Sequence, residues 1–223
     1  MQVRRSSPRP LEFSASCRAC PRLAAHLASI RVRHPGYHAR PVAPFGDARS
    51  RLLVVGLAPG LHGANRTGRP FTGDFAGELL YATLHRHGFA SQPWVRDADD
   101  GLELIGCRIT NAVKCLPPQN KPDPAEVKRC NGYLRAELAA LQPKAAILAL
   151  GRIAHGAILK ALLLPQRAYP FAHGARFRFT AGFSLYDSYH CSRYNTQTRR
   201  LTAAMFDAVV GAIAADLAAS SPG

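Results

Sequence analysis

One glycine-rich stretch of the sequence, residues 56–74, contains side chains of very different chemistry. Its chemistry-bearing members are Asn65, Arg66, Arg69, Phe71 and Asp74. The stretch follows the apolar run Leu52 to Val55, which predicts a buried strand. Glycines let a backbone approach a ligand closely, and parallel sheets bind ligands where their strands end. We therefore expect a binding site here.

Four cysteines form a second group that could do chemistry. Cys17 and Cys20 make a CxxC directly before Pro21, and proline suits the first position of a helix, whose amino terminus favours thiolates. Cys115 and Cys130 lie far along the chain. The four thiols could hold Zn²⁺ or an iron–sulfur cluster, or the CxxC could be a coincidence beside an ordinary buried Cys130. Spacing alone leaves these alternatives open.

The remaining cysteines are interpreted as non-ligands. Cys107 falls inside a predicted strand, and Cys191 is adjacent to His190. Neighbouring residues of an extended chain point to opposite faces, which disfavours a nucleophilic Cys–His pair.

Apolar periodicity predicts alternating strands and helices. Strands are expected at 52–55, 105–113, 145–150 and 184–186, with a minor one at 176–179. Helices are expected at 21–30, 74–88, 124–141, 153–163 and from about 201 to 217. This order predicts a three-layer α/β/α fold with a mainly parallel central sheet of about four strands. Polar loops follow the first, second and fourth strands, so they should converge into one active site.

Composition bounds the partners. The 223 residues carry 29 basic and 14 acidic side chains, a net charge of +15. Such an excess favours a polyanion as binding partner, with nucleic acid as the leading class, although charges spread over a solvated surface are the plain alternative.

We expect one domain over residues 1–223, with a flexible basic arm at 1–12. No apolar run suggests a membrane span or a secretory signal, so a cytoplasmic protein is expected.

Four motifs in this order resemble the family 5 uracil-DNA glycosylases. They are GLAPG (56–60), RTGRPFTGDFAG (66–77), TNAVKCLPPQNKP (110–122) and SYHCSRYNTQT (188–198). Family 4 carries Glu where this chain has Leu57, and Asp74 favours family 5. Gly60 stands where many members have Ala. Arg199 stands where the pattern usually has Gly, so the turn into the last helix should differ or add a phosphate contact.

The resemblance implies a uracil-DNA glycosylase-like fold and a DNA repair enzyme that hydrolyses the N-glycosidic bond of uracil flipped out of DNA. It also implies a [4Fe–4S] cluster, expected to be structural, on Cys17, Cys20, Cys115 and Cys130. Family members accept further deaminated bases, so hypoxanthine and xanthine are candidate substrates. We expect a monomer.

Residue roles follow from the matched motifs. The resemblance makes Asp74 the carboxylate that positions water or stabilises the oxocarbenium ion, with helix capping as its rival role. His190 would donate to the uracil O2, Phe71 would stack on the base, and Asn120 would recognise its edge. The backbone of Gly56, Leu57, Ala58, Pro59 and Gly60 would wrap the base.

Phosphate contacts are expected from basic side chains near these motifs. The candidates are Arg66, Arg69, Arg193, Arg199 and Arg200. Tyr194 is the candidate wedge into the vacated stack.

Two other functions remain open. A non-catalytic iron–sulfur or zinc nucleic-acid-binding module would keep the cysteines and the charge without needing Phe71, Asn120 and His190 together. A phosphate-binding enzyme is disfavoured because GxxxxGK[ST] is absent: Arg69 and Pro70 follow Gly63 to Gly68.

Overall fold

The computed structural model describes residues 12–180 and 182–220, and its centre is a six-stranded sheet in the order β1-β3-β2-β4-β6-β5. The strands are β1 (Phe45–Gly46), β2 (Leu52–Gly56), β3 (Cys107–Asn111), β4 (Ala146–Leu150), β5 (Arg176–Arg178) and β6 (Ser184–Ser188). The four central strands run parallel, and β1 and β5 pair antiparallel at the edges. The predicted α/β fold with four parallel strands is confirmed; β1 is too short to leave a periodic signal.

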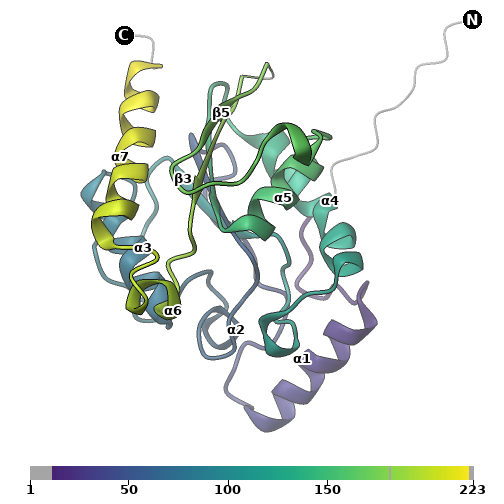
Figure 1. The fold of residues 1–223 in the computed structure, drawn as a ribbon. Coiled ribbons are helices and arrows are strands. Elements are labelled where there is room, and N and C mark those ends of the chain that lie inside the picture. The colour runs from purple at the N-terminus through teal and green to yellow at the C-terminus, as the bar shows by residue number, and fades with distance from the viewer. Residues whose placement is uncertain (1–11, 181, 221–223) are drawn as a thin grey trace, which may run out of the picture.

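Helices cover both faces of the sheet. They are α1 (Pro21–Arg33), α2 (Ala64–Thr67), α3 (Phe75–Arg86), α4 (Pro124–Ala140), α5 (Arg152–Ala161), α6 (Arg193–Gln197) and α7 (Ala203–Ala219). Figure 1 shows α3 and α7 on one side of the sheet, α4 and α5 on the other, and α1, α2 and α6 together at one end. The five longer helices were predicted, whereas α2 and α6 are single turns inside segments predicted as loops.

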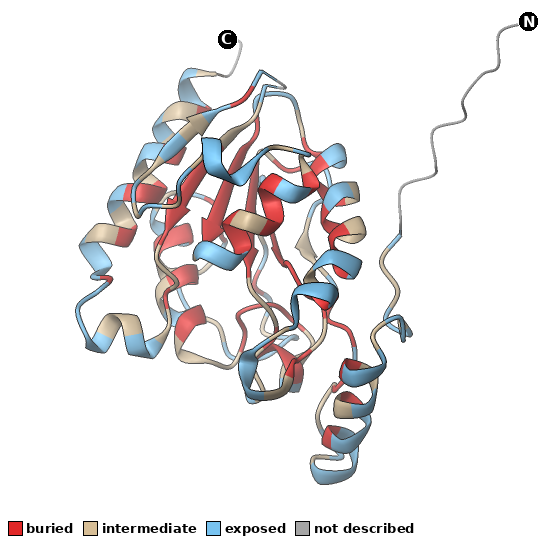
Figure 2. Ribbon diagram, turned by 45° about the vertical axis from the view of Figure 1, so that its right-hand side comes forward, coloured by how far each residue is buried: buried red, intermediate tan, exposed pale blue. Residues whose placement is uncertain are grey.

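Burial on both faces explains the continuous apolar strands. In β2, Leu52 and Val54 pack into the core beneath α3 and α7, while Leu53 and Val55 pack into the core beneath α4 and α5. Every residue of β2 and β4 is buried, as the red strands in Figure 2 show. Such two-sided burial is typical of parallel sheets, and it fixes the positions of the loops that leave the strands.

Acidic side chains cap the amino termini of two helices next to the motifs. The Asp74 carboxylate accepts a hydrogen bond from the Gly77 N–H at 3.1 Å, at the start of α3. At the start of α4, the Glu126 side chain accepts from the Asp123 N–H at 2.8 Å, which is half of a capping box. These caps determine where the polar loops end.

Part of the segment between α1 and β2, which is rich in Pro, Arg and His, is packed into the fold. Ala39 and Val42 are buried, and their backbone N–H groups donate to Asn65 and Lys114 carbonyls at 3.0 and 2.7 Å. Backbone hydrogen bonds of this kind leave no trace in composition, so the Pro- and Arg-rich sequence hid them.

Two further expectations concern the chain as a whole. Apart from Glu12, the arm expected at 1–12 lies outside the described residues. Among the helices of the described part, none is both long and apolar enough to cross a bilayer.

Candidate active site

A cavity of about 490 Å³ opens at the end of the sheet where β2, β3 and β6 terminate. Side chains from all three polar loops line it, including Leu57, Phe71, Asp74, Asn111, Asn120 and His190. Asp74, Asn120 and His190 therefore share one cavity, as the convergence of the loops predicted. The three polar loops therefore converge on one cavity, as strand order predicted.

Within the glycine loop after β2, different residues do different things. Leu57, Ala58 and Gly60 line the cavity, whereas Gly56 and Pro59 are buried. A Cβ on Gly56 would stand 2.5 Å from the Asn111 Oδ1 and 2.7 Å from the Phe71 ring. Gly56 thus belongs to the site by leaving room for two other side chains.

The two carboxylate oxygens of Asp74 have separate surroundings. Oδ1 accepts the Gly77 N–H, while Oδ2 lies toward Gly60 and Gly63; a Cβ on Gly63 would stand 2.2 Å from it. Burial raises the pKa of this carboxyl above its ordinary range. Helix capping and a role in the cavity are therefore compatible, because each uses a different oxygen.

His190 and Phe71 lie together on one wall of the cavity. Their rings stack with centroids 5.8 Å apart and an interplanar angle of 29°. Burial lowers the pKa of His190 to about 4, so the imidazole is neutral at pH 7. The Asn195 amide donates to the His190 carbonyl at 2.8 Å, which fixes the loop that carries the ring. A neutral imidazole in this place can still donate one N–H.

Two asparagine amides face the cavity at different depths. Asn120 ends a 3₁₀ turn with a φ of 56° and is exposed at the rim. Asn111 ends β3, is 3% exposed, and its Oδ1 has no hydrogen-bond partner among the described residues. Sequence reasoning missed Asn111, because it was counted as part of the strand. A polar amide at the carboxyl end of a buried parallel strand was the available signal.

Arg69 was predicted as a DNA contact, and the structure places it elsewhere. Its side chain is 5% exposed, its Nη2 donates to the Asp100 Oδ2 at 2.8 Å, and its guanidinium lies over the Phe45 ring at 5.0 Å. A buried, paired arginine cannot reach a phosphate. We therefore interpret Arg69 as a structural residue that holds its loop against Asp100 and Phe45.

The other predicted DNA contacts are exposed and lie on or next to the short helices α2 and α6, each of which provides a lining residue of the cavity. They are Arg66 on α2, Arg193 and Tyr194 on α6, and Arg199 and Arg200 just after α6. Arg193 lines the cavity and Tyr194 is 71% exposed. Arg199 has a φ of 56°, a left-handed conformation that glycine adopts without strain. The turn into α7 thus keeps a geometry that suits glycine although an arginine occupies it.

The four cysteines of the motifs border one separate cavity of about 200 Å³. Cys17, Cys20, Cys115 and Cys130 line it, and all four are free thiols. Burial, followed by the charges of the other three cysteines, raises the pKa of Cys115 to about 12. Cys107 and Cys191 are fully buried elsewhere.

The spacing of these thiols bears on what they could hold. Among the described residues, no group of three or more His, Cys, Asp or Glu side chains could hold a metal ion. A single zinc ion needs its sulfur ligands about 2.3 Å away. The four thiols border a cavity of about 200 Å³, and four cysteines are a ligand set that both zinc and iron–sulfur clusters use.

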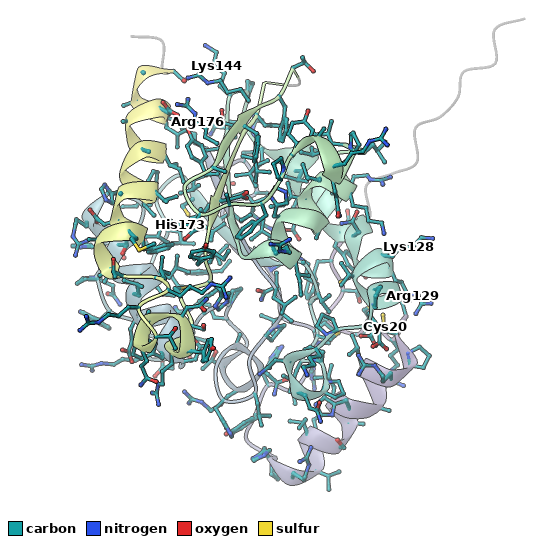
Figure 3. The ribbon with its side chains drawn as sticks, in the orientation of Figure 1. Cys20, Lys128, Arg129, Lys144, His173 and Arg176 are labelled. Atoms are coloured by element: carbon teal, nitrogen blue, oxygen red, sulfur yellow. The ribbon has the colours of Figure 1, made fainter. Side chains whose placement is uncertain are left out.

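Contacts outside the thiols hold the cysteine segments together. Arg22 of α1 pairs with Glu126 of α4 at 2.6 Å, and Arg129 donates to the Ala19 carbonyl at 2.8 Å. Figure 3 shows Arg129 and Cys20 next to each other where α1 meets α4. The Lys114 N–H donates to the Cys130 sulfur at 3.4 Å. Direct protein contacts therefore hold the segments around Cys20, Cys115 and Cys130 next to one another.

Comparison with known proteins gives one consistent result. Residues 43–214 match the model of the uracil DNA glycosylase superfamily. The chain is 48% identical over 196 residues to a type-5 uracil-DNA glycosylase of Thermus thermophilus, covering 86% of this chain and 89% of that one. Type-5 relatives of Pyrobaculum aerophilum (42%, covering 90% and 89%) and Mycobacterium leprae (44%, covering 86% and 87%) match over similar lengths.

Proposed function

This chain belongs to the uracil DNA glycosylase superfamily and is a uracil-DNA glycosylase, a hydrolase of DNA repair, and we propose where its reaction takes place. The N-glycosidic bond would be broken in the cavity that holds Asp74, Asn120 and His190. The shared cavity is the observation that carries the proposal. A target base inside a duplex is out of reach, so the nucleotide must first leave the stack, at a cost of a few kcal/mol.

Asn111 and Asn120 together read the base in this proposal. The buried Asn111 Oδ1 has no partner among the described residues, and a buried unsatisfied acceptor costs about 1–3 kcal/mol. An imide N–H of uracil would satisfy it, while the amide nitrogen could donate to a carbonyl oxygen of the base. Asn120 would close over the base from the rim.

Phe71 would provide the surface on which the extruded base stacks. Base–aromatic stacking contributes about 1–3 kcal/mol. Phe71 already packs against His190, so the base would extend an existing stack.

Asp74 would act on the sugar and the water. As the glycosidic bond lengthens, positive charge develops on the deoxyribose, and an ionised Asp74 would stabilise it or orient the attacking water. Leu57 offers no polar atom for that task, so the Oδ2 that faces the glycine loop is the acidic oxygen within reach of the cavity.

His190 would stabilise the departing base. Negative charge collects on its O2, and the neutral imidazole can donate one N–H to that oxygen. A preorganised donor of this kind typically changes the rate by about 10²–10³.

Cys17, Cys20, Cys115 and Cys130 would hold a [4Fe–4S] cluster. When bound, the cluster supplies a cross-link between α1, α4 and the loop after β3, and no step of base removal requires it. The four thiols on one cavity support this assignment.

The DNA backbone would lie across the exposed arginines. Arg66, Arg193, Arg199 and Arg200 would contact phosphates, and the exposed Tyr194 would wedge into the vacated stack. Binding would then weaken steeply with increasing salt concentration.

We further propose that the enzyme works as a monomer in the cytoplasm. It would also accept hypoxanthine and xanthine, because Leu57 places no polar group against a larger base.

Incubation with matched oligonucleotides, each carrying uracil, hypoxanthine or xanthine, tests the proposal. Alkali then reveals abasic sites, and we expect strand scission with uracil in single-turnover conditions. An Asp74→Asn variant that removes uracil at the normal rate would exclude the catalytic role of Asp74. Normal rates in both Asp74→Asn and His190→Ala would exclude this cavity as the reaction site, whereas intact hypoxanthine and xanthine strands would exclude only the wider substrate range.

A further inference from the structure

A cavity of about 530 Å³ lies beside α1 and shares no lining residue with the candidate active site. Three arginine side chains line it, and no acidic residue does. Arg18 lies between the two cysteines of the CxxC, Arg31 is in the last turn of α1, and Arg40 follows the helix. Three separate parts of the chain thus bring guanidinium groups to one cavity.

The charges of these arginines are not balanced by protein. All three are exposed, and none pairs with a carboxylate among the described residues. Arg31 is held in place because its Nη1 donates to the Ala39 carbonyl at 2.8 Å, which uses one of five donors. By contrast, Arg22 on the same helix pairs with Asp123 and Glu126. Like charges around a cavity repel one another, and a bound anion would relieve that repulsion.

Backbone hydrogen bonds connect the arginine cavity to the loop beside the candidate active site. Arg40 of the arginine cavity follows Ala39, whose N–H donates to the Asn65 carbonyl at 3.0 Å, and the His38 N–H donates to the Arg66 carbonyl at 3.0 Å. The arginine segment therefore runs against the loop that borders the active site. Figure 1 shows α1 and α2 at the same end of the molecule.

We propose that Arg18, Arg31 and Arg40 bind a phosphate of the DNA backbone away from the extruded nucleotide, so that α1 is part of the DNA interface. The proposal rests on the DNA substrate of the proposed function. It gives the part of the chain around the CxxC a role in binding in addition to its place in the fold.

The test compares two triple variants that remove the same charge. R18A/R31A/R40A removes the cavity arginines, and R135A/K160A/R167A removes exposed charges on α4, α5 and the turn after α5. Binding to a uracil-free duplex is measured over a range of salt concentrations. We expect the first variant to reduce the slope of log K against log salt by about 0.9 for each phosphate that the cavity arginines neutralise. The control should keep the slope of the unmodified enzyme.

Two further readouts make the result specific. Removal of uracil from a short single strand, which ends before it reaches α1, should proceed equally in both triple variants, with iron content and Tm as checks on folding. Equal slopes for the two variants, or a loss of this short-strand activity in the first one, would overturn the proposal. An inorganic phosphate effect on Tm that needs the arginines, without a change in the DNA slope, would assign the cavity to free phosphate and overturn the DNA assignment. The duplex carries no uracil, so this result does not depend on glycosylase activity.

Discussion

The cavity of the candidate active site and the cavity of the cysteines are supported by different parts of the fold. The first lies where β2, β3 and β6 end, and it combines polar side chains with apolar ones such as Leu57 and Phe71 at the ends of largely buried strands. The second lies between α1, α4 and the loop after β3, and thiols and apolar side chains dominate its lining. The sheet positions the side chains of the first cavity, whereas in our proposal a cluster on the four cysteines would link α1 and α4 to the loop after β3.

One loop joins the two cavities. It leaves β3 at Asn111, provides Cys115 to the cysteine cavity and returns Asn120 to the rim of the active site. Because Asn111 is anchored in a buried strand and Asn120 is not, disturbance of the cysteines should reach Asn120 first. We therefore expect variants of the two cavities to differ in their effects on chemistry, stability and base recognition.

The largest effect should come from the chemistry of the sheet cavity. Asp74→Asn should slow single-turnover uracil removal by about 10²–10⁴ with little change in Tm, because asparagine also caps a helix but carries no charge. The control is Thr202→Ala, which removes the hydroxyl that accepts the Met205 N–H at the start of α7. It should lower stability by about 1 kcal/mol and leave the rate unchanged. The opposite pattern would show that Asp74 serves only as a cap.

Loss of a cysteine should affect stability more than chemistry. Cys115→Ser should release iron and lower Tm by roughly 5–15 °C, since each kcal/mol of destabilisation shifts Tm by about 2–4 °C at this chain size. Well below the new Tm, the single-turnover rate should stay within about tenfold of normal. Cys107→Ala, at a buried cysteine outside the cavity, should keep its iron. If a folded Cys115→Ser enzyme lost the reaction completely, the cysteine cavity would be needed for the chemistry as well as for stability.

The two amides should differ according to their depth. Asn111→Ala should reduce the rate at limiting enzyme by about 10–100-fold, because a hydrogen bond in the buried floor is worth about 1–3 kcal/mol. Asn120→Ala, at the exposed rim, should have a smaller effect. A pre-steady-state comparison of both variants on the same uracil duplex measures this, and a reversed order would move base recognition to the rim.

The smallest effect should be seen in the pH dependence of the single-turnover rate, whose acid limb should lie at a higher pH than for an ordinary carboxyl group. The role proposed for Asp74 needs the ionised form, and burial raises its pKa, so the rate should fall with decreasing pH above the ordinary carboxyl range of about 4. His190, with a pKa of about 4, stays neutral over most of that range. Single-turnover rates from pH 4 to 8 test this, and Asp74→Asn should abolish the limb. A limb that persists in that variant belongs to another group.

Local pattern was sufficient for the fold because the main signals are short in range. The parallel strands are mostly short apolar runs. The capping residues of α3 and α4, which are Asp74 and the pair Asp123 and Glu126, lie within four residues of the helix starts. The motifs also identified most of the cavity lining, since each loop directly follows its strand. The single-turn helices α2 and α6 escaped notice because four or five residues cannot show a helical period.

Arg69 and Asn111 show where sequence reasoning ended. In sequence, Arg69 is one more basic residue of a polar loop; only folding brings it to Asp100, 31 positions away, and buries both. Asn111 looks like the end of a strand until Gly56 is aligned beside it and leaves space for its side chain. The sequence alone determined the order of strands and helices, the positions of the loops and the residues available for chemistry. Tertiary structure decided which of those residues share a cavity and which are neutralised in the interior, because burial and pairing depend on neighbours that are distant in the chain.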